Sequence, residues 1–240
     1  MHVLLPLKKV SDAKERLSIL LDKTHRQGLF KAMTDDVISV LTKHPGISRV
    51  AIISDDPVAA QLAEDYQTEL LTENELKVGG LNAVIQAAVS RLALRQIDDV
   101  MVIHADLPLI NAANLSQLIS LHNNSDGPRL TIAPDRHNNG SNCLICNPAS
   151  TFTFKYGKDS FRKHCAQADS LRFGIQVLEN PDIGCDIDYP HDLVHFLDRT
   201  KGRGSTHTVK YLNKNGITHT FINSICNQST MQGLQHERVS

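Results

Sequence analysis

The stretch that decides the fold is VMVIHADLPL, residues 100–109. Its first four residues form an unbroken apolar run, which predicts a strand buried on both faces of a sheet. The run ends at His104, and Asp106 follows two residues later. Open α/β sheets bind their ligands beyond the carboxyl ends of the strands. Asp106 is therefore a candidate for chemistry, although a turn or cap is the usual role of a lone carboxylate at a strand end.

Similar runs recur on both sides of this strand and alternate with segments of helical periodicity. Strands are predicted at residues 3–7, 49–54, 70–71, 100–104, 130–134, 141–146 and 174–178, and helices at 24–43, from 57, and at 81–95, 112–123, 160–168 and 190–199. The alternation predicts a single Rossmann-like α/β domain whose mainly parallel sheet is covered on both faces.

The character of the chain changes after about residue 200. Residues 200–205 are small, basic and glycine-rich, which is typical of a linker. Residues 207–212 and 217–223 flank Asn-Lys-Asn-Gly, which suggests a hairpin, and the polar residues 228–240 suggest a disordered tail. We therefore expect one α/β domain at 1–199 and an extension at 200–240 that the chemistry does not require.

Composition argues against several classes of function. The 25 basic and 26 acidic side chains give a net charge of −1, which provides no basic field for nucleic acid. Aromatic content of 5 % without tryptophan argues against a stacking platform for single strands. No apolar run approaches the length of a membrane span, and the apolar start is too short for a signal peptide. We expect a cytoplasmic protein that binds neither nucleic acid nor membrane.

The five cysteines are odd in number and scattered, which does not fit a disulfide framework. Cys143 and Cys146 lie three apart on a predicted strand, where side chains point to opposite faces. Buried thiols are the expected interpretation.

Basic side chains cluster in the loop that follows the first strand. Lys8, Lys14 and Arg16 combine compact ammonium groups with a guanidinium fork, and both types bind phosphate. A solvated basic loop is the alternative interpretation of the same residues.

A second acidic motif is DIDYPHD, residues 186–192. Alternate residues of an extended segment share a side, and Asp192 suits the first turn of the next helix better than a metal. We expect one aspartate of the D-x-D, Asp186 or Asp188, to meet Asp106 across a divalent cation, because Mg²⁺ takes only one or two protein carboxylates and keeps several waters.

Two glycine-containing segments precede predicted helices. Gly80 and Asn82 stand where helix amides favour anions or polar base edges, and the loops around Arg136, Gly157 and Ser160 suit a nest for a phosphate or carboxylate. Plain loop-to-helix junctions remain the alternative for both segments.

Together these segments resemble one family. The motifs are LPLKKVSDAKERLS (5–18), GGLNAVIQAA (79–88), HADLPLI (104–110), APDRHNNGSN (133–142), YGKDSF (156–161) and DIDYPHDL (186–193). In this order they are similar to the motifs of the CofC/FbiD guanylyltransferases of coenzyme F-420 biosynthesis. ADLP and D-x-P-x-D-L alone would indicate only the wider nucleotidyltransferase superfamily with its GT-A-like fold.

The resemblance implies an activity and a set of site residues. It implies GMP transfer from GTP to a phosphorylated three-carbon acid (2-phospho-L-lactate, phosphoenolpyruvate or 3-phospho-D-glycerate), with release of pyrophosphate and a need for Mg²⁺ or Mn²⁺. The implied roles are Lys14, Arg16, Asp106 and Asp188 in catalysis, Asp106 and Asp188 at the metal, Leu5, Lys8, Lys14, Gly80 and Asn82 at the nucleotide, and Asn142, Gly157 and Ser160 at the acceptor.

Two other functions stay open at this level. One is a sugar-phosphate or molybdenum-cofactor nucleotidyltransferase, which would usually begin with a glycine-rich loop where this chain has Leu5-Pro6-Leu7-Lys8. The other is a nucleotide-binding module without catalysis. The sequence also leaves open a homodimer and a contact with the enzyme that accepts the unstable product.

Overall fold

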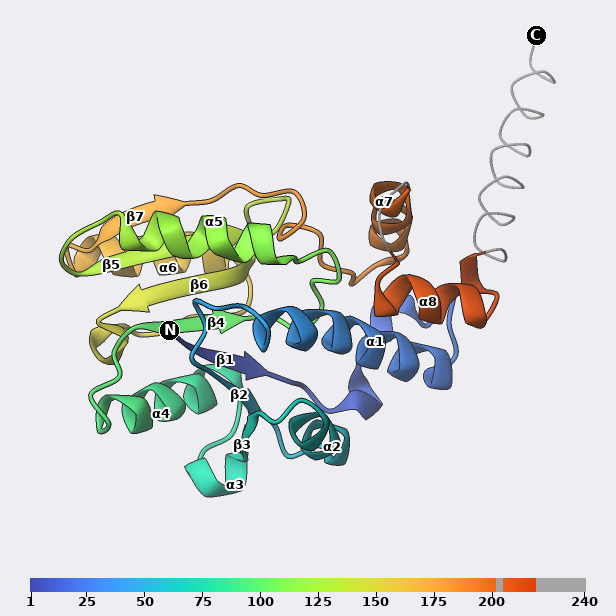
Figure 1. Ribbon diagram of the computed structural model, residues 1–240, viewed down its shortest axis with the longest axis horizontal. Coiled ribbons are helices and arrows are strands. Elements are labelled where there is room, and N and C mark those ends of the chain that lie inside the picture. The colour runs from blue at the N-terminus through green and yellow to red at the C-terminus, as the bar shows by residue number, and fades with distance from the viewer. Residues whose placement is uncertain (202–204, 219–240) are drawn as a thin grey trace, which may run out of the picture.

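The computed structural model describes residues 1–201 and 205–218 (Figure 1). Its seven strands are β1 (His2–Pro6), β2 (Arg49–Ile53), β3 (Glu69–Leu71), β4 (Val100–Ile103), β5 (Arg129–Pro134), β6 (Ser141–Asn147) and β7 (Gly174–Val177). Its helices are α1 (Lys23–Leu41), α2 (Pro57–Asp65), α3 (Glu73–Leu76), α4 (Leu81–Ala93), α5 (Ala112–Asn123), α6 (Ser160–Ser170), α7 (Pro190–Thr200) and α8 (His207–Lys214). These elements confirm the α/β class.

The strands form one sheet in the order β3-β2-β1-β4-β6-β5-β7. β1 pairs in parallel with β2 on one side and β4 on the other, so the strand order switches direction between β1 and β4. β6 runs antiparallel to both of its neighbours. The amino end of β6 therefore meets the carboxyl ends of β1 and β4, which are the ligand-binding edge of such a sheet.

Alternate strand residues build two separate cores, one on each face. Met101 and Ile103 of β4 belong to the core under α1, α2, α5 and α7, whereas Val100 and Val102 belong to the core under α4 and α6. This two-sided burial follows from the continuous apolar strands.

The cysteine interpretation is confirmed for the described cysteines of the sheet. Cys143 and Cys146 are fully buried, one in each core. Burial raises the pKa of both thiols. Cys226 lies outside the described residues.

Helix starts follow their capping residues. Asp56 caps α2 by accepting from Val58 N at 2.8 Å, and Pro57 takes the first helical position. The other oxygen of Asp56 accepts from Val10 N at 2.8 Å. One carboxylate thus starts a helix and also ties down the loop that follows β1.

The expected hairpin after residue 206 is wrong in its first arm, which forms helix α8 along α1 (Figure 1). Buried Asp36 of α1 accepts hydrogen bonds from His207 N at 2.6 Å and Thr208 N at 2.9 Å at the start of α8. The Asn-Gly pair that suggested a hairpin turn ends the helix instead, with Gly216 at a φ of +67°. The rest of the hairpin, residues 219–223, and the tail, residues 228–240, lie outside the described residues.

The extension also approaches α1 closely. A Cβ added at Gly28 would lie 2.2 Å from Tyr211 Oη, and Leu212 is fully buried in the α1 core. Residues 207–212 therefore pack on the domain as part of a helix, where the sequence suggested one arm of a hairpin.

Candidate active site

Three charged side chains meet beyond the carboxyl ends of β1 and β4. Lys14 Nζ donates to Asp106 Oδ2 at 2.5 Å and to Asp188 Oδ1 at 2.7 Å. The Lys14 side chain is only 5 % exposed, although it comes from a basic surface loop. We call Lys14, Asp106 and Asp188 the carboxylate site; its members lie up to 174 residues apart in the chain.

The backbone of Lys14 explains how the side chain reaches inward. Lys14 has a φ of 55°, in the left-handed region that non-glycine residues rarely adopt, and it begins the short 3-10 turn η2 (Glu15–Leu17). Leu17 at the end of this turn is fully buried. The buried leucine and the buried ion pairs together hold the strained residue in place.

Electrostatics keep the carboxylate site ionised. Burial would lower the pKa of Lys14, but the charges of Asp106 and Asp188 outweigh it and raise that pKa above its ordinary value. Burial would likewise raise the pKa of Asp106, but the Lys14 and His104 charges hold it below the usual range. The paired charges therefore stabilise the ammonium form of Lys14 and the carboxylate form of Asp106.

Asp188 and Asp186 have different surroundings. Asp186 accepts from Asn142 Nδ2 at 3.2 Å, and burial together with the charge of Asp106 raises its pKa to about 7. Asp188 is 38 % exposed and receives Arg16 Nη1 at 3.3 Å as well as Lys14. Only Asp188 of the two shares a cation with Asp106.

Asp192 starts α7, as its position in the sequence suggested. Its Oδ2 accepts from Asp188 N at 2.9 Å and Tyr189 N at 2.7 Å, and its Oδ1 accepts from Arg136. Arg136 is thus paired with Asp192, where the sequence suggested a free charge for a ligand. The pairing fixes the backbone of Asp188 against the loop after β5.

The remaining predicted nucleotide residues lie around this centre. The Arg16 guanidinium lies 4.8 Å from the centre of the Tyr189 ring, a cation–π contact that orients it beside Asp188. Lys8 is exposed and makes no recorded side-chain contact within the described residues. The Leu5 side chain is fully buried in the core, so only its backbone can face a ligand.

Gly80 and Asn82 lie at the start of α4, on the face of the sheet opposite α1. Gly80 has a φ of +88° and open space where a Cβ would stand. Asn82 uses both atoms of its amide on Tyr156, donating to Tyr156 O at 3.1 Å and accepting from Tyr156 N at 2.7 Å. Sequence reasoning missed this contact, which joins residues 74 positions apart.

The predicted acceptor residues lie at the amino ends of β6 and α6. Asn142 is 4 % exposed, and its amide donates to Ile183 O at 2.9 Å in addition to Asp186. Gly157 has a φ of +116°, and its carbonyl accepts from Ser160 N at 3.1 Å. A Cβ added at Gly157 would meet nothing within 4 Å, so this side of the residue is open.

The loop after β5 does not form the open nest that its sequence suggested. The Asp135 carboxylate accepts from the amides of His137, Asn139 and Gly140 at 2.7–3.0 Å. These amides are therefore already satisfied by a side chain of the same loop.

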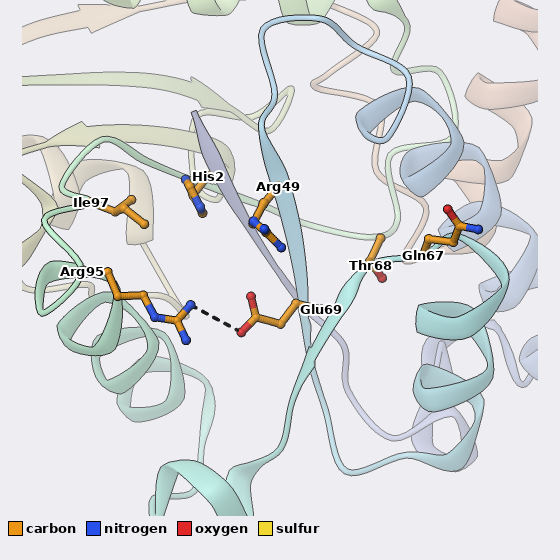
Figure 2. A pocket seen from close by; sticks show the side chains of 7 residues that line it. All are labelled: His2, Arg49, Gln67, Thr68, Glu69, Arg95 and Ile97. Atoms are coloured by element: carbon orange, nitrogen blue, oxygen red, sulfur yellow. Dashed lines mark ion pairs between the residues drawn. The ribbon is translucent and has the colours of Figure 1, made fainter.

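A separate hollow lies at the other end of the strands (Figure 2). It is open, measures about 670 Å³, and is lined by His2, Arg49, Gln67, Thr68, Glu69, Arg95 and Ile97. We call these seven residues the amino-end hollow. Arg95 and Glu69 form an ion pair in this hollow at 4.0 Å, and both side chains are partly exposed. The hollow contains one carboxylate and no buried charge, which suits it poorly for phosphoryl chemistry.

Comparison with known proteins agrees with the geometry at the carboxyl edge. The family model described as "Guanylyl transferase CofC like" matches residues 1–231. The chain belongs to the CofC-like guanylyl transferase family.

Curated relatives of this family cover most of the chain. The phosphoenolpyruvate guanylyltransferase of Conexibacter woesei is 30 % identical over 213 residues, which is 88 % of this chain and 94 % of the relative. The 2-phospho-L-lactate guanylyltransferase of Methanothermobacter thermautotrophicus is 30 % identical over 211 residues, covering 88 % and 89 % of the two chains. Membership in this family makes the chain an enzyme of the nucleotidyltransferase class.

Solved structures support the fold of the CofC-like chain. A presumed nucleotide-diphospho-sugar transferase from Desulfovibrio desulfuricans superposes with a TM-score of 0.74 at 14 % identity, covering 92 % of this chain and 97 % of the other. A cytidylyltransferase from Leptospira borgpetersenii gives a TM-score of 0.55 at 13 % identity, with 90 % and 94 % covered. The GT-A-like architecture implied by the motifs is thereby confirmed. No helix of the described residues is long and apolar enough to cross a membrane.

Proposed function

We propose that this enzyme transfers GMP from GTP to a phosphorylated three-carbon acid and releases pyrophosphate, as a step of coenzyme F-420 biosynthesis. The observation that carries the proposal is the carboxylate site: a buried ammonium between two carboxylates at the switch point of the sheet, Asp106 just after β4 and Asp188 just before α7. The names of the relatives support phosphoenolpyruvate and 2-phospho-L-lactate as the first acids to test. The motif resemblance adds 3-phospho-D-glycerate.

The donor set of the carboxylate site fits a divalent cation. Asp106 Oδ1 is buried and has no hydrogen-bond partner, and Asp188 keeps an exposed side. No group of three or more His, Cys, Asp or Glu side chains that could hold a metal occurs in residues 1–201 and 205–218. Two carboxylates suffice for Mg²⁺ or Mn²⁺ when water and phosphate oxygens complete the shell. Bound there, the metal would supply positive charge against the phosphate oxygens.

The chain's own residues then have distinct roles in the proposed reaction. An oxygen of the acceptor phosphate attacks the α-phosphorus of GTP, and the bond from that phosphorus to the bridging oxygen of the β-phosphate breaks. The acceptor needs no general base, since the second pKa of a phosphate monoester is about 6. Lys14 and Arg16 would bind the triphosphate and offset the charge that develops on the pyrophosphate.

The two substrates would lie on opposite sides of the carboxylate site. Lys8, the backbone at Leu5 and the α4 start at Gly80 would contact the nucleotide. Asn142, Gly157 and Ser160 would surround the acceptor, with the Gly157 amide as the donor that its open surroundings favour. The choice of guanine as the base rests on family membership alone.

A product-mass experiment tests the proposal. The protein is incubated with Mg²⁺, each of the four nucleoside triphosphates and each of the three acids, and products are weighed by mass spectrometry while pyrophosphate is assayed. We expect a GMP adduct of one acid together with an equal amount of pyrophosphate, and none with Asp106→Asn. An adduct of another nucleotide, such as CMP, would support the wider superfamily function, and GTP binding without turnover would support a non-catalytic module.

A further inference from the structure

Residues 154–156, just before Gly157 of the proposed acceptor site, make their backbone hydrogen bonds to side chains and not to a neighbouring strand. Three consecutive amides donate to side chains: Phe154 N to Gln86 Oε1 at 3.4 Å, Lys155 N to His164 Nε2 at 2.9 Å, and Tyr156 N to Asn82 Oδ1 at 2.7 Å. Within the described residues, these amides make no backbone–backbone hydrogen bond. The path of this segment therefore depends on the side chains that receive it.

Asn82 makes the most complete of these contacts. Its Oδ1 and Nδ2 bind the N–H and C=O of Tyr156 together, which closes a two-bond pair like one rung of a sheet. Gln86, one turn further along α4, supports Phe154 from the same helix face. The resemblance places Asn82 at the nucleoside, but both ends of its amide are engaged with the chain itself.

The clamped residue connects the carboxylate site to the acceptor loop. The Tyr156 ring is buried and packs against His104 with ring centres 5.3 Å apart, and His104 comes two residues before Asp106. The next residue is Gly157, whose φ of +116° turns the chain into α6. A shift of Tyr156 therefore moves Gly157 relative to Asp106.

Asn82 is also the second residue of α4, directly after the Gly80 turn. We propose that Asn82 is a positioning residue that fixes the Tyr156–Gly157 backbone against the start of α4, so that the acceptor is held at a set distance from the nucleotide. The inference rests on the proposed function, because it takes Gly157 as an acceptor contact. It assigns Asn82 an effect on the acid substrate, where a nucleoside contact would affect GTP.

Two variants and one control separate these roles. Asn82→Ala removes both bonds to Tyr156, Asn82→Asp keeps the acceptor for Tyr156 N but loses the donor, and Ser90→Ala changes an exposed residue of the same helix whose hydroxyl bonds only within α4. Amide hydrogen exchange of residues 153–158 is measured alongside the KM values for GTP and for the accepted acid. Circular dichroism confirms that each variant is folded.

For Asn82→Ala we expect exchange at Tyr156 to quicken about tenfold and the KM of the acid to rise about tenfold, the scale of two lost hydrogen bonds. The KM of GTP should stay within about twofold, Asn82→Asp should lie between, and Ser90→Ala should match the unchanged protein. Unchanged exchange, or a rise confined to the KM of GTP, would overturn the inference. If the protein proves not to transfer GMP at all, the exchange result still decides whether Asn82 holds the loop, so the two failures are distinct.

Discussion

The two ends of the same sheet carry charge in opposite ways. At the carboxyl end, Lys14 lies 2.5 Å from Asp106 and 2.7 Å from Asp188 and is almost completely buried. At the amino end, Arg95 lies 4.0 Å from Glu69, and both side chains are partly exposed to solvent (Figure 2). The hollow of about 670 Å³ lies at the amino end, away from the buried charges.

The contrast shows that concavity alone does not locate the chemistry of this protein. Burying an ammonium and two carboxylates carries a large desolvation cost, which a fold offsets only through close pairing. Exposed pairs such as Arg95–Glu69 contribute little and arise without selection for function. Perturbed, buried charges at a strand end are the better guide to a reactive site.

The largest expected effect is at the two carboxylates. Asp106→Asn or Asp188→Asn should lower kcat/KM on the order of 10³-fold or more, because each removes a charge that the transition state uses. Asp186→Asn should cost much less, because Asp186 faces Asn142 and shares no cation with Asp106. The kinetics are measured at saturating Mg²⁺. Near-normal activity of both single variants would remove the basis for a two-carboxylate site.

Lys14→Met sharpens the comparison in two ways. Loss of its contact to the triphosphate should cost about 2–4 kcal/mol of transition-state stabilisation, whereas exposed Lys9→Ala should cost far less. The variant also leaves two carboxylates without their cation, so its metal-free form should be less stable at pH 7 and recover as acid protonates one of them.

The directions of the Lys14 and Asp106 pKa shifts predict how the stability of the unchanged protein depends on pH. The Lys14 pKa is raised, so its contribution is present below pH 10.5 and is lost only as pH rises further. The Asp106 pKa is lowered, so its contribution is present above pH 3.8 and is lost on acidification. Thermal melts at several pH values, with and without Mg²⁺, check these contributions. Mg²⁺ should raise the Tm of Lys14→Met more than that of the unchanged protein. An equal rise would contradict the ion-pair account.

Sequence reasoning succeeded where the signal is local. The apolar run of β4 predicted that strand, because a buried strand is set by neighbouring residues. The grouping of Asp106 with Asp188 could be inferred only through strand order and family motifs. The placement of Cys143 and Cys146 on opposite faces of the sheet followed from the two-residue period of a strand.

The contacts that the sequence could not reveal join distant residues. Nothing near Asn82 indicates that its amide will bind Tyr156, and nothing near Arg136 indicates Asp192 as its partner. The Asn-Gly pair before residue 217 was ambiguous because Asn-Gly suits a hairpin turn and a helix end alike. Burial of α8 residues such as Leu212 against α1 stabilises the helix, and this tertiary contact cannot be predicted from the local sequence.

Acidification should lower the free energy of unfolding through buried His164 more than through His2 of the amino-end hollow. Burial lowers the pKa of His164 to about 4, and its Nε2 accepts from Lys155 N, which requires the neutral ring. Between pH 6.5 and 4 the unfolded chain binds a proton that the folded chain does not. The free energy of unfolding should therefore fall by up to about 3 kcal/mol across this window.

Urea unfolding of His164→Gln at several pH values tests this assignment. The variant should lose most of that slope, while His2→Gln in the amino-end hollow should change it less, because His2 is less buried than His164. An unaltered slope in His164→Gln would mean that other groups carry the acid sensitivity.

The smallest expected effect is at the amino-end hollow. Arg49→Ala and Arg95→Ala remove exposed guanidinium groups, one of which has only the 4.0 Å contact to Glu69. Surface changes of this kind usually alter stability by no more than about 0.5 kcal/mol. Because the hollow lies at the opposite end of β1 from the carboxylate site, kcat/KM should also stay within about twofold, in contrast to Lys14→Met. Both variants are assayed with GTP and the accepted acid beside Lys14→Met under the same conditions. A loss of more than about fivefold in either arginine variant would show that the hollow acts on the reaction, and the division between the two ends of the sheet would then fail.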